Sequence, residues 1–138
     1  MKSNRKGPPT IEDGAAIKAN ILAALAFAKL QRDIKVIVAS VKSPEPYVTL
    51  LSQAKDIAET EWRKSESLLR NRGIEIYKRT HLKESLEVKY LCGNYDDSAS
   101  YRWNVLGVDV RRMISDYLAQ QYDTPTPDFT SLTAVGPH

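Results

Sequence analysis

Two long amphipathic segments, joined by Ser43-Pro44-Glu45-Pro46, constrain this chain most strongly. In the first segment, apolar residues and one asparagine recur at intervals of seven in two series offset by four, a spacing typical of helices that pack against each other. The two series are Ala16, Ala23, Leu30 and Ile37, and Asn20, Phe27, Ile34 and Val41. Serine and proline favour a new helix start, and so short a link predicts that the second segment returns antiparallel to the first.

The ends of these two helices follow from local signals. Thr10 can cap the first helix by accepting the backbone N–H three residues on, and the acidic residues that follow it suit the positive end of the helix dipole. The β-branched run from Ile34 to Val41 is also compatible with a strand, so two alternatives stand for the end of this helix. Apolar spacings of three and four predict the second helix over Pro46 to Arg72, with Gly73 ending it.

The second half of the chain has a mixed pattern. Alternating β-branched and aromatic residues favour two short strands, Ile74 to Thr80 and Leu86 to Leu91, although Leu82, Leu86 and Tyr90 also fit one helical face. Residues 93–98 have the composition of a loop. A last helix is expected from Ser98 or Ser100 to about Gln121, because its apolar residues keep helical spacing. These residues are Trp103, Leu106, Val110, Met113 and Tyr117.

These elements predict a mainly α fold: a long antiparallel helix pair plus a C-terminal helix, with a small β-hairpin. An all-α four-helix bundle is the alternative, if residues 74–92 are helical. A chain of 138 residues suits one domain with a self-supporting core. We therefore expect a flexible basic arm over residues 1–9, a single helical domain over 10–122 and a Pro/Thr-rich tail over 123–138.

The N-terminal region does not fit an export signal. Basic residues precede an apolar stretch from Ala19 to Ala28, but Glu12, Asp13 and Lys18 stand between the two features. The stretch is also shorter than the ~20 apolar residues that a membrane-spanning helix needs. Cys92 is the single cysteine, which excludes an internal disulfide. We expect a cytoplasmic protein that does not enter a membrane.

Few residues suggest catalysis. The glycines form no phosphate-binding series, and one cysteine is too few for a multi-cysteine zinc site. Cys92 and His81 are a conceivable nucleophile–base pair, but nothing in their spacing supports it, and a buried structural cysteine with a surface histidine is the better interpretation. We expect no enzyme activity, no catalytic residue, no metal and no cofactor.

The first helix carries a second apolar face. Ile17, Ile21 and Leu25 recur at intervals of four, nearly opposite the seven-residue pattern, and an apolar face of this kind must be covered. Asn20 within the seam either fixes register or oligomeric state, or is satisfied within one bundle. We therefore predict a non-catalytic helical interaction protein, an oligomer or a subunit of a larger assembly, whose protein-binding residues are Ile17, Ile21 and Leu25.

The alternative function rests on charge. Between Trp62 and Lys83 the chain has seven basic and two acidic residues, a local charge of +5 in a chain with a net charge of +3. Aromatic residues interleave with these charges, as they do in nucleic-acid-binding grooves. The alternative is a small basic nucleic-acid-binding regulatory protein. Its candidate residues are Arg63, Lys64, Arg70, Arg72, Lys78 and Arg79.

Overall fold

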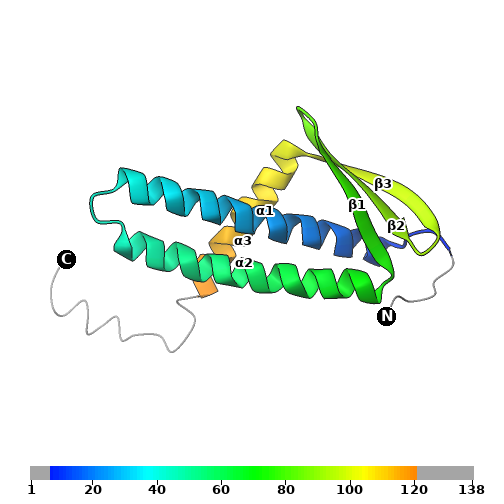
Figure 1. The fold of residues 1–138 in the computed structure, drawn as a ribbon, viewed down its shortest axis with the longest axis horizontal. Coiled ribbons are helices and arrows are strands. Elements are labelled where there is room, and N and C mark those ends of the chain that lie inside the picture. The colour runs from blue at the N-terminus through cyan, green and yellow to red at the C-terminus, as the bar shows by residue number, and fades with distance from the viewer. Residues whose placement is uncertain (1–6, 121–138) are drawn as a thin grey trace.

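The fold consists of a helix hairpin, an antiparallel sheet and a last helix that crosses the hairpin (Figure 1). The structure is a computed structural model and describes residues 7–120. Most of the expected arm and all of the expected tail lie outside these residues. The elements, in chain order, are α1 (Ile11–Ser40), α2 (Glu45–Asn71), β1 (Ile74–His81), β2 (Ser85–Cys92), β3 (Tyr95–Arg102) and α3 (Trp103–Gln120).

Helices α1 and α2 form the expected antiparallel pair. Helix α1 has 30 residues and is therefore about 45 Å long. It begins with a capping box, in which Thr10 N–H donates to Asp13 Oδ2 at 2.8 Å and Asp13 N–H donates to Thr10 Oγ1 at 3.2 Å. The helix continues to Ser40, so the strand alternative for residues 34–41 is wrong. Gly73, with a φ of 72°, follows the C-terminus of α2 as predicted.

The sheet has three strands where the sequence predicted two. Strands β1 and β2 pair antiparallel, and β3 then adds to the other side of β2 in the order β1-β2-β3. A two-residue turn allows this, because Gly93 has a φ of 64° and Cys92 pairs directly with Tyr95. Residues 95–102, expected as loop and helix start, are therefore a strand. The predicted hairpin is corrected to a three-stranded sheet, and the four-helix alternative is not supported.

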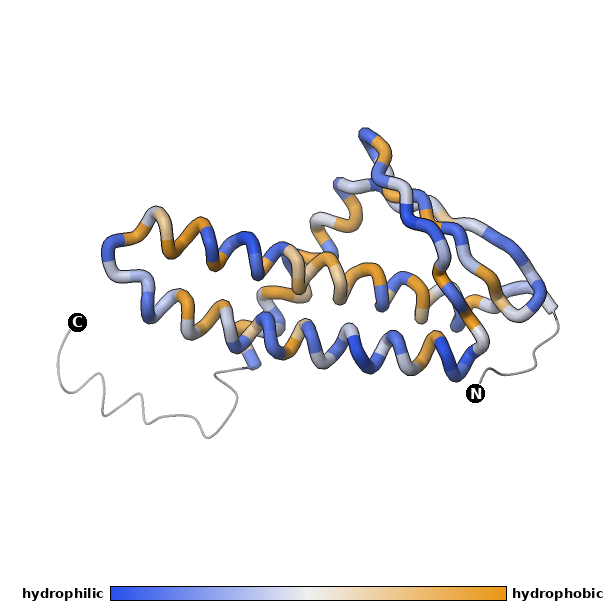
Figure 2. Tube along the Cα trace, in the orientation of Figure 1, coloured by the Kyte–Doolittle hydropathy of each residue, from blue (hydrophilic) through white to orange (hydrophobic). Residues whose placement is uncertain are grey.

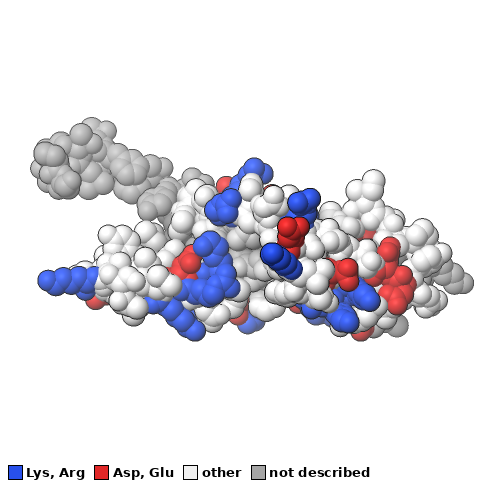
Figure 3. Space-filling view, turned by 90° about the horizontal axis from the view of Figure 1, so that it is seen from above, with Lys and Arg blue, Asp and Glu red and all other residues white. Residues whose placement is uncertain are grey.

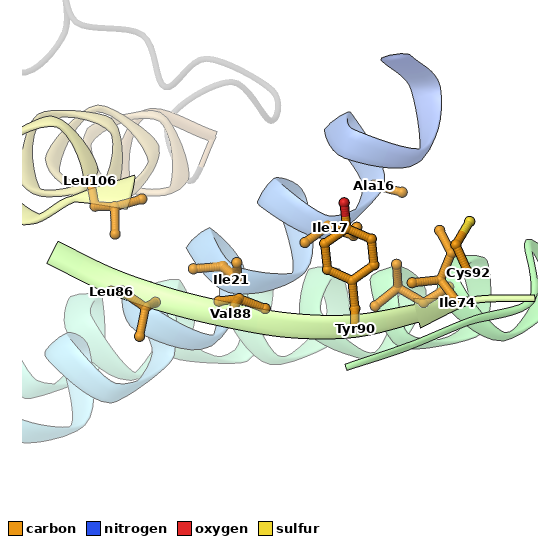
Figure 4. Close-up of a cluster of buried hydrophobic side chains, with 10 residues drawn as sticks. Ala16, Ile17, Ile21, Ile74, Leu86, Val88, Tyr90, Cys92 and Leu106 are labelled. Carbon is orange, nitrogen blue, oxygen red and sulfur yellow. The ribbon is translucent and has the colours of Figure 1, made fainter. Parts of the chain in front are cut away.

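The sheet packs on the N-terminal half of α1, and α3 crosses the helix pair nearer its middle (Figure 1). The side chains of β2 alternate, so that every second one points towards the helices and is buried. These residues form one core with the start of α1 and with Leu106 of α3 (Figure 4). The members on β2 are Leu86, Val88, Tyr90 and Cys92.

A second core lies where α3 crosses the hairpin. It contains Ala26 and Leu30 of α1, the alanines of α2, and Val110 and Tyr117 of α3. Figure 2 shows more apolar segments along α1 than along α2. All three helices contribute to both cores, and α1 contributes buried residues along most of its first 20 positions. Over residues 7–120, no helix has the length and apolar character needed to cross a bilayer.

Candidate functional site

The predicted docking face of α1 is covered by the chain itself. Ile17 is 0% exposed and Ile21 is 2% exposed, and both lie in the core beneath β2 (Figure 4). Leu25 is half-buried and packs against both cores. The expectation that Ile17 and Ile21 form an uncovered face is therefore wrong, because a sheet, which helical spacing cannot reveal, supplies the cover.

Another face of α1 remains open. A cavity of about 440 Å³ lies between α1, α2 and α3, and a second of about 370 Å³ continues it between α1 and α3. The two cavities share Ala19, Leu22 and Met113, so they form one depression, which we call the α1–α3 groove. Its apolar lining is completed by Ala15, Ala23, Leu68 and Tyr117.

Charged side chains stand at the two ends of the α1–α3 groove. At one end, Glu61 of α2 and Asp116 of α3 lie near the hydroxyl of Tyr117, and Lys64 is also at the wall. Burial raises the pKa of Tyr117, and the negative charges of Glu61 and Asp116 raise that pKa further. At the other end, Lys18 and Asp109 form a 3.1 Å salt bridge from α1 to α3. The Tyr117 end therefore favours a positive group.

The predicted nucleic-acid-binding residues are not gathered into one surface. Arg63 pairs with Glu59 at 2.8 Å within α2, and Arg70 donates to Ser67 at 3.1 Å on the same helix. Lys64 belongs to the α1–α3 groove, and Lys78 lies on β1, opposite Lys89 of β2. Basic and acidic side chains are interspersed on the face shown in Figure 3. Nucleic-acid binding stays a prediction that this arrangement does not favour.

The remaining two arginines of that set bond to buried residues of α1. Arg79 donates to Asn20 Oδ1 at 3.4 Å, and Asn20 Nδ2 donates to Ser65 at 3.0 Å. The polar partners of Asn20 thus come from its own chain, as in the second alternative of the sequence interpretation. Arg72 Nη1 lies 3.0 Å from Oδ1 of Asp13, which is 0% exposed. Both arginines therefore hold α1 to the elements that follow it.

Cys92 and His81 lie at opposite ends of the sheet. Cys92 pairs with Ile74 and His81 with Leu86, so six residues of strand, about 20 Å, separate them. Cys92 is buried, as predicted, and its Sγ donates to Asp13 Oδ2 at 3.7 Å. The exposed His81 has its ring 5.2 Å from that of Trp103. These positions exclude a nucleophile–base pair between the two residues.

The sequence interpretation missed the cluster of Asp13, Arg72 and Cys92. It took Asp13 as an acid that suits the first helical turn, and Arg72 as a residue at a helix end and a candidate for nucleic-acid binding, although the Thr10/Asp13 spacing of a capping box was visible. Only the fold brings Arg72 and Cys92, which are 59 and 79 residues away, to this carboxylate. The part of the chain that the structure describes contains no group of three or more His, Cys, Asp or Glu residues suited to a metal ion.

A comparison with protein families gives a match to most of the chain. Residues 8–122 match a protein-family model described as YhjD protein, which covers all six elements of the fold. No curated protein and no solved structure matches the chain.

Proposed function

The chain belongs to the YhjD protein family, and we propose that it is a non-catalytic interaction protein that binds an amphipathic helix of another protein in the α1–α3 groove. The observation that carries this proposal is the continuous apolar depression in which Ala19, Leu22 and Met113 join two cavities. Apolar grooves between helices are a recurring way of binding a helical segment. The proposed binding site is therefore the α1–α3 groove, which lies on the other side of α1 from the predicted docking face of Ile17, Ile21 and Leu25.

The dimensions of the groove suit a short helix. Along α1 the lining runs from Ala15 to Ala23, about 12 Å, and along α3 it runs from Asp109 to Gln120, about 17 Å. Two to three helical turns fill such a length. Alanines on α1 allow close approach of a partner backbone, while Leu22 and Met113 provide larger apolar contacts. The bound helix should present apolar residues at positions i, i+3 or i+4, and i+7.

Charge selects among such helices. Because Glu61 and Asp116 stand beside Tyr117 at one end of the groove, a partner with a lysine or arginine at that end is favoured over one with an acidic residue. The apolar residues supply most of the affinity and the basic residue sets the direction of the helix. We therefore commit to a basic amphipathic helix as the ligand.

The test is a selection from a displayed library of helical peptides on the full chain. Selected peptides should carry the apolar spacing and a basic residue, and Ala19→Arg should weaken their binding by at least about tenfold, because an arginine there fills the groove. Ala39→Arg is the matched control, since Ala39 is an exposed alanine of the same helix outside the groove. The proposal is refuted if the selection enriches no peptides with this pattern, or if the selected peptides bind the Ala19→Arg variant as tightly as the unmodified chain.

We place this activity in the cytoplasm. The support is Cys92, the single cysteine of the chain, which is buried in the core, as suits a protein of a reducing compartment. Fractionation of cells that express the tagged chain tests this proposal, and recovery in a membrane or secreted fraction contradicts it. Titration of the chain with DNA and RNA at several salt concentrations tests the nucleic-acid alternative, because phosphate contacts predict affinity that falls steeply as salt rises.

A further inference from the structure

The two edges of the sheet differ in regularity. Strand β1 has a register shift between Ile76 and Lys78, and it lies beside α2. Strand β3 pairs with β2 at all eight positions from Tyr95 to Arg102 without a shift. Bulges are a common means of blocking further pairing at an edge, and β3 has none. Within residues 7–120, no strand pairs with the second edge of β3.

The backbone groups on that edge can be assigned from the turn. Tyr95 pairs with Cys92 across the two-residue turn, so the alternation of an antiparallel ladder directs the N–H and C=O groups of every second residue away from β2. The outward residues are Asp96, Ser98, Ser100 and Arg102. Two contacts agree with this assignment: Ser98 N–H donates to the side chain of Asp97 at 2.8 Å, and Trp103 N–H donates inward to Glu84 O at 3.0 Å.

We propose that β3 pairs antiparallel with β3 of a second copy of this chain, about a two-fold axis at Ala99, to form a continuous six-stranded sheet. This register places Asp96 of one copy opposite Arg102 of the other, twice in the dimer. It also places Ser98 opposite Ser100, and puts the small side chain of Ala99 where the two strands cross the axis. A two-fold contact requires such self-complementarity.

Charge complementarity distinguishes this register from its neighbours. A slip by one residue turns the buried face of one strand towards the solvent side of the other. Changing the pairing by two residues places Asp96 opposite Ser100, or Ser98 opposite Arg102, and loses both pairs of opposite charges. Oppositely charged residues directly across a strand pair are stabilising, and like charges are destabilising. Tyr77 of β1 donates to Asp96 Oδ1 at 2.6 Å, which places that carboxylate over the exposed face of the sheet, the face on which Arg102 of the second copy lies in this register.

The contact is separate from the α1–α3 groove, so either proposal can fail alone. An extended peptide of another protein could also pair with this edge, but the paired charges favour a second copy. A partner strand supplies backbone hydrogen bonds along the whole edge, a recognised mode of strand addition. The dimer therefore removes the one regular open edge that the described residues contain.

The test is the molecular mass of the full chain in solution, measured by sedimentation equilibrium. We expect twice the chain mass of 15.5 kDa. Arg102→Asp places a second carboxylate opposite Asp96 at both ends of the dimer contact. This repulsion should weaken association by about tenfold or more. The double change Asp96→Arg with Arg102→Asp restores opposite charges and should recover the dimer. Lys78→Glu, a charge reversal on the other edge strand, is the matched control and should leave the mass unchanged.

Other results overturn the proposal. A monomeric unmodified chain at high micromolar concentration refutes it directly. A dimer that withstands Arg102→Asp, or one that the double change fails to recover although circular dichroism shows it to be folded, places the contact elsewhere. Ser98→Pro provides a further check, because it removes an outward N–H that bonds to the exposed side chain of Asp97 and not to β2. It should give a folded monomer.

Discussion

Replacing Asp13 with asparagine removes a buried negative charge with almost no change in side-chain size. Asp13 is 0% exposed, and its oxygens meet Arg72 Nη1 at 3.0 Å and Thr10 N–H at 2.8 Å. The amide of asparagine can still accept from Thr10 but no longer balances the guanidinium. The substitution therefore isolates the charge from the shape of the capping box.

The expected cost follows from these contacts. Removing one partner of a fully buried pair costs about 3–5 kcal/mol, but the side chain of Arg72 is 34% exposed, so solvent screening reduces that loss to about 2 kcal/mol. A weaker cap adds up to about 1 kcal/mol. We expect the free energy of unfolding to fall by about 2–3 kcal/mol, which lowers the Tm by about 8 °C for a chain of this length.

Urea unfolding followed by circular dichroism measures this change. Glu12→Gln is the control, since Glu12 is an exposed acid in the same first turn and should lose only about 0.5 kcal/mol from the helix dipole. The double change of Asp13→Asn with Arg72→Met should recover part of the loss, because no unpaired charge then remains. If Asp13→Asn costs no more than Glu12→Gln, the buried pair does not stabilise this fold.

Three further changes test the second core, the buried hydrogen bond of Asn20 and the groove. Leu30→Ala removes a side chain that is 0% exposed where α3 crosses the hairpin, and should cost about 3 kcal/mol in urea unfolding. Asn20→Ala removes the 3.0 Å bond to Ser65 and should cost about 1–3 kcal/mol in the same assay. Because the pKa of Tyr117 is raised above 10.0 in the folded chain, its contribution to stability is present below that pH and is lost as pH rises through the folded-state pKa. Tyr117→Phe should therefore make the alkaline loss of stability shallower, and an unchanged profile contradicts the assignment.

The helices were predictable because their signals are local. The periodic apolar residues of α1, α2 and α3 each indicated a helix, and Thr10 and Gly73 indicated ends that the structure confirms. The Ile34–Val41 run was ambiguous, because β-branched residues suit strands. Continuity with the preceding helix and packing against α2 hold it in helical form.

The third strand was not predictable from its own residues. Asp96, Asp97, Ser98 and Ser100 have low or modest strand propensity and suggested a loop or a helix start. Pairing with β2 supplies their backbone hydrogen bonds and overrides that preference. The docking face was misplaced for another reason: Ile17 and Ile21 lie beneath β2, a strand that the sequence predicted, but its alternating pattern does not show which helix it will cover.

The sequence by itself determined that α1 is apolar on more than one side, because 3.6-residue periodicity depends only on neighbouring residues. Tertiary structure alone decided which side is open: the sheet covers Ile17 and Ile21, whereas α3 crosses at an angle and leaves Ala19 exposed in the lining of a groove. Burial depends on residues distant in the chain that come to lie against a face, and helical spacing carries no information about their position.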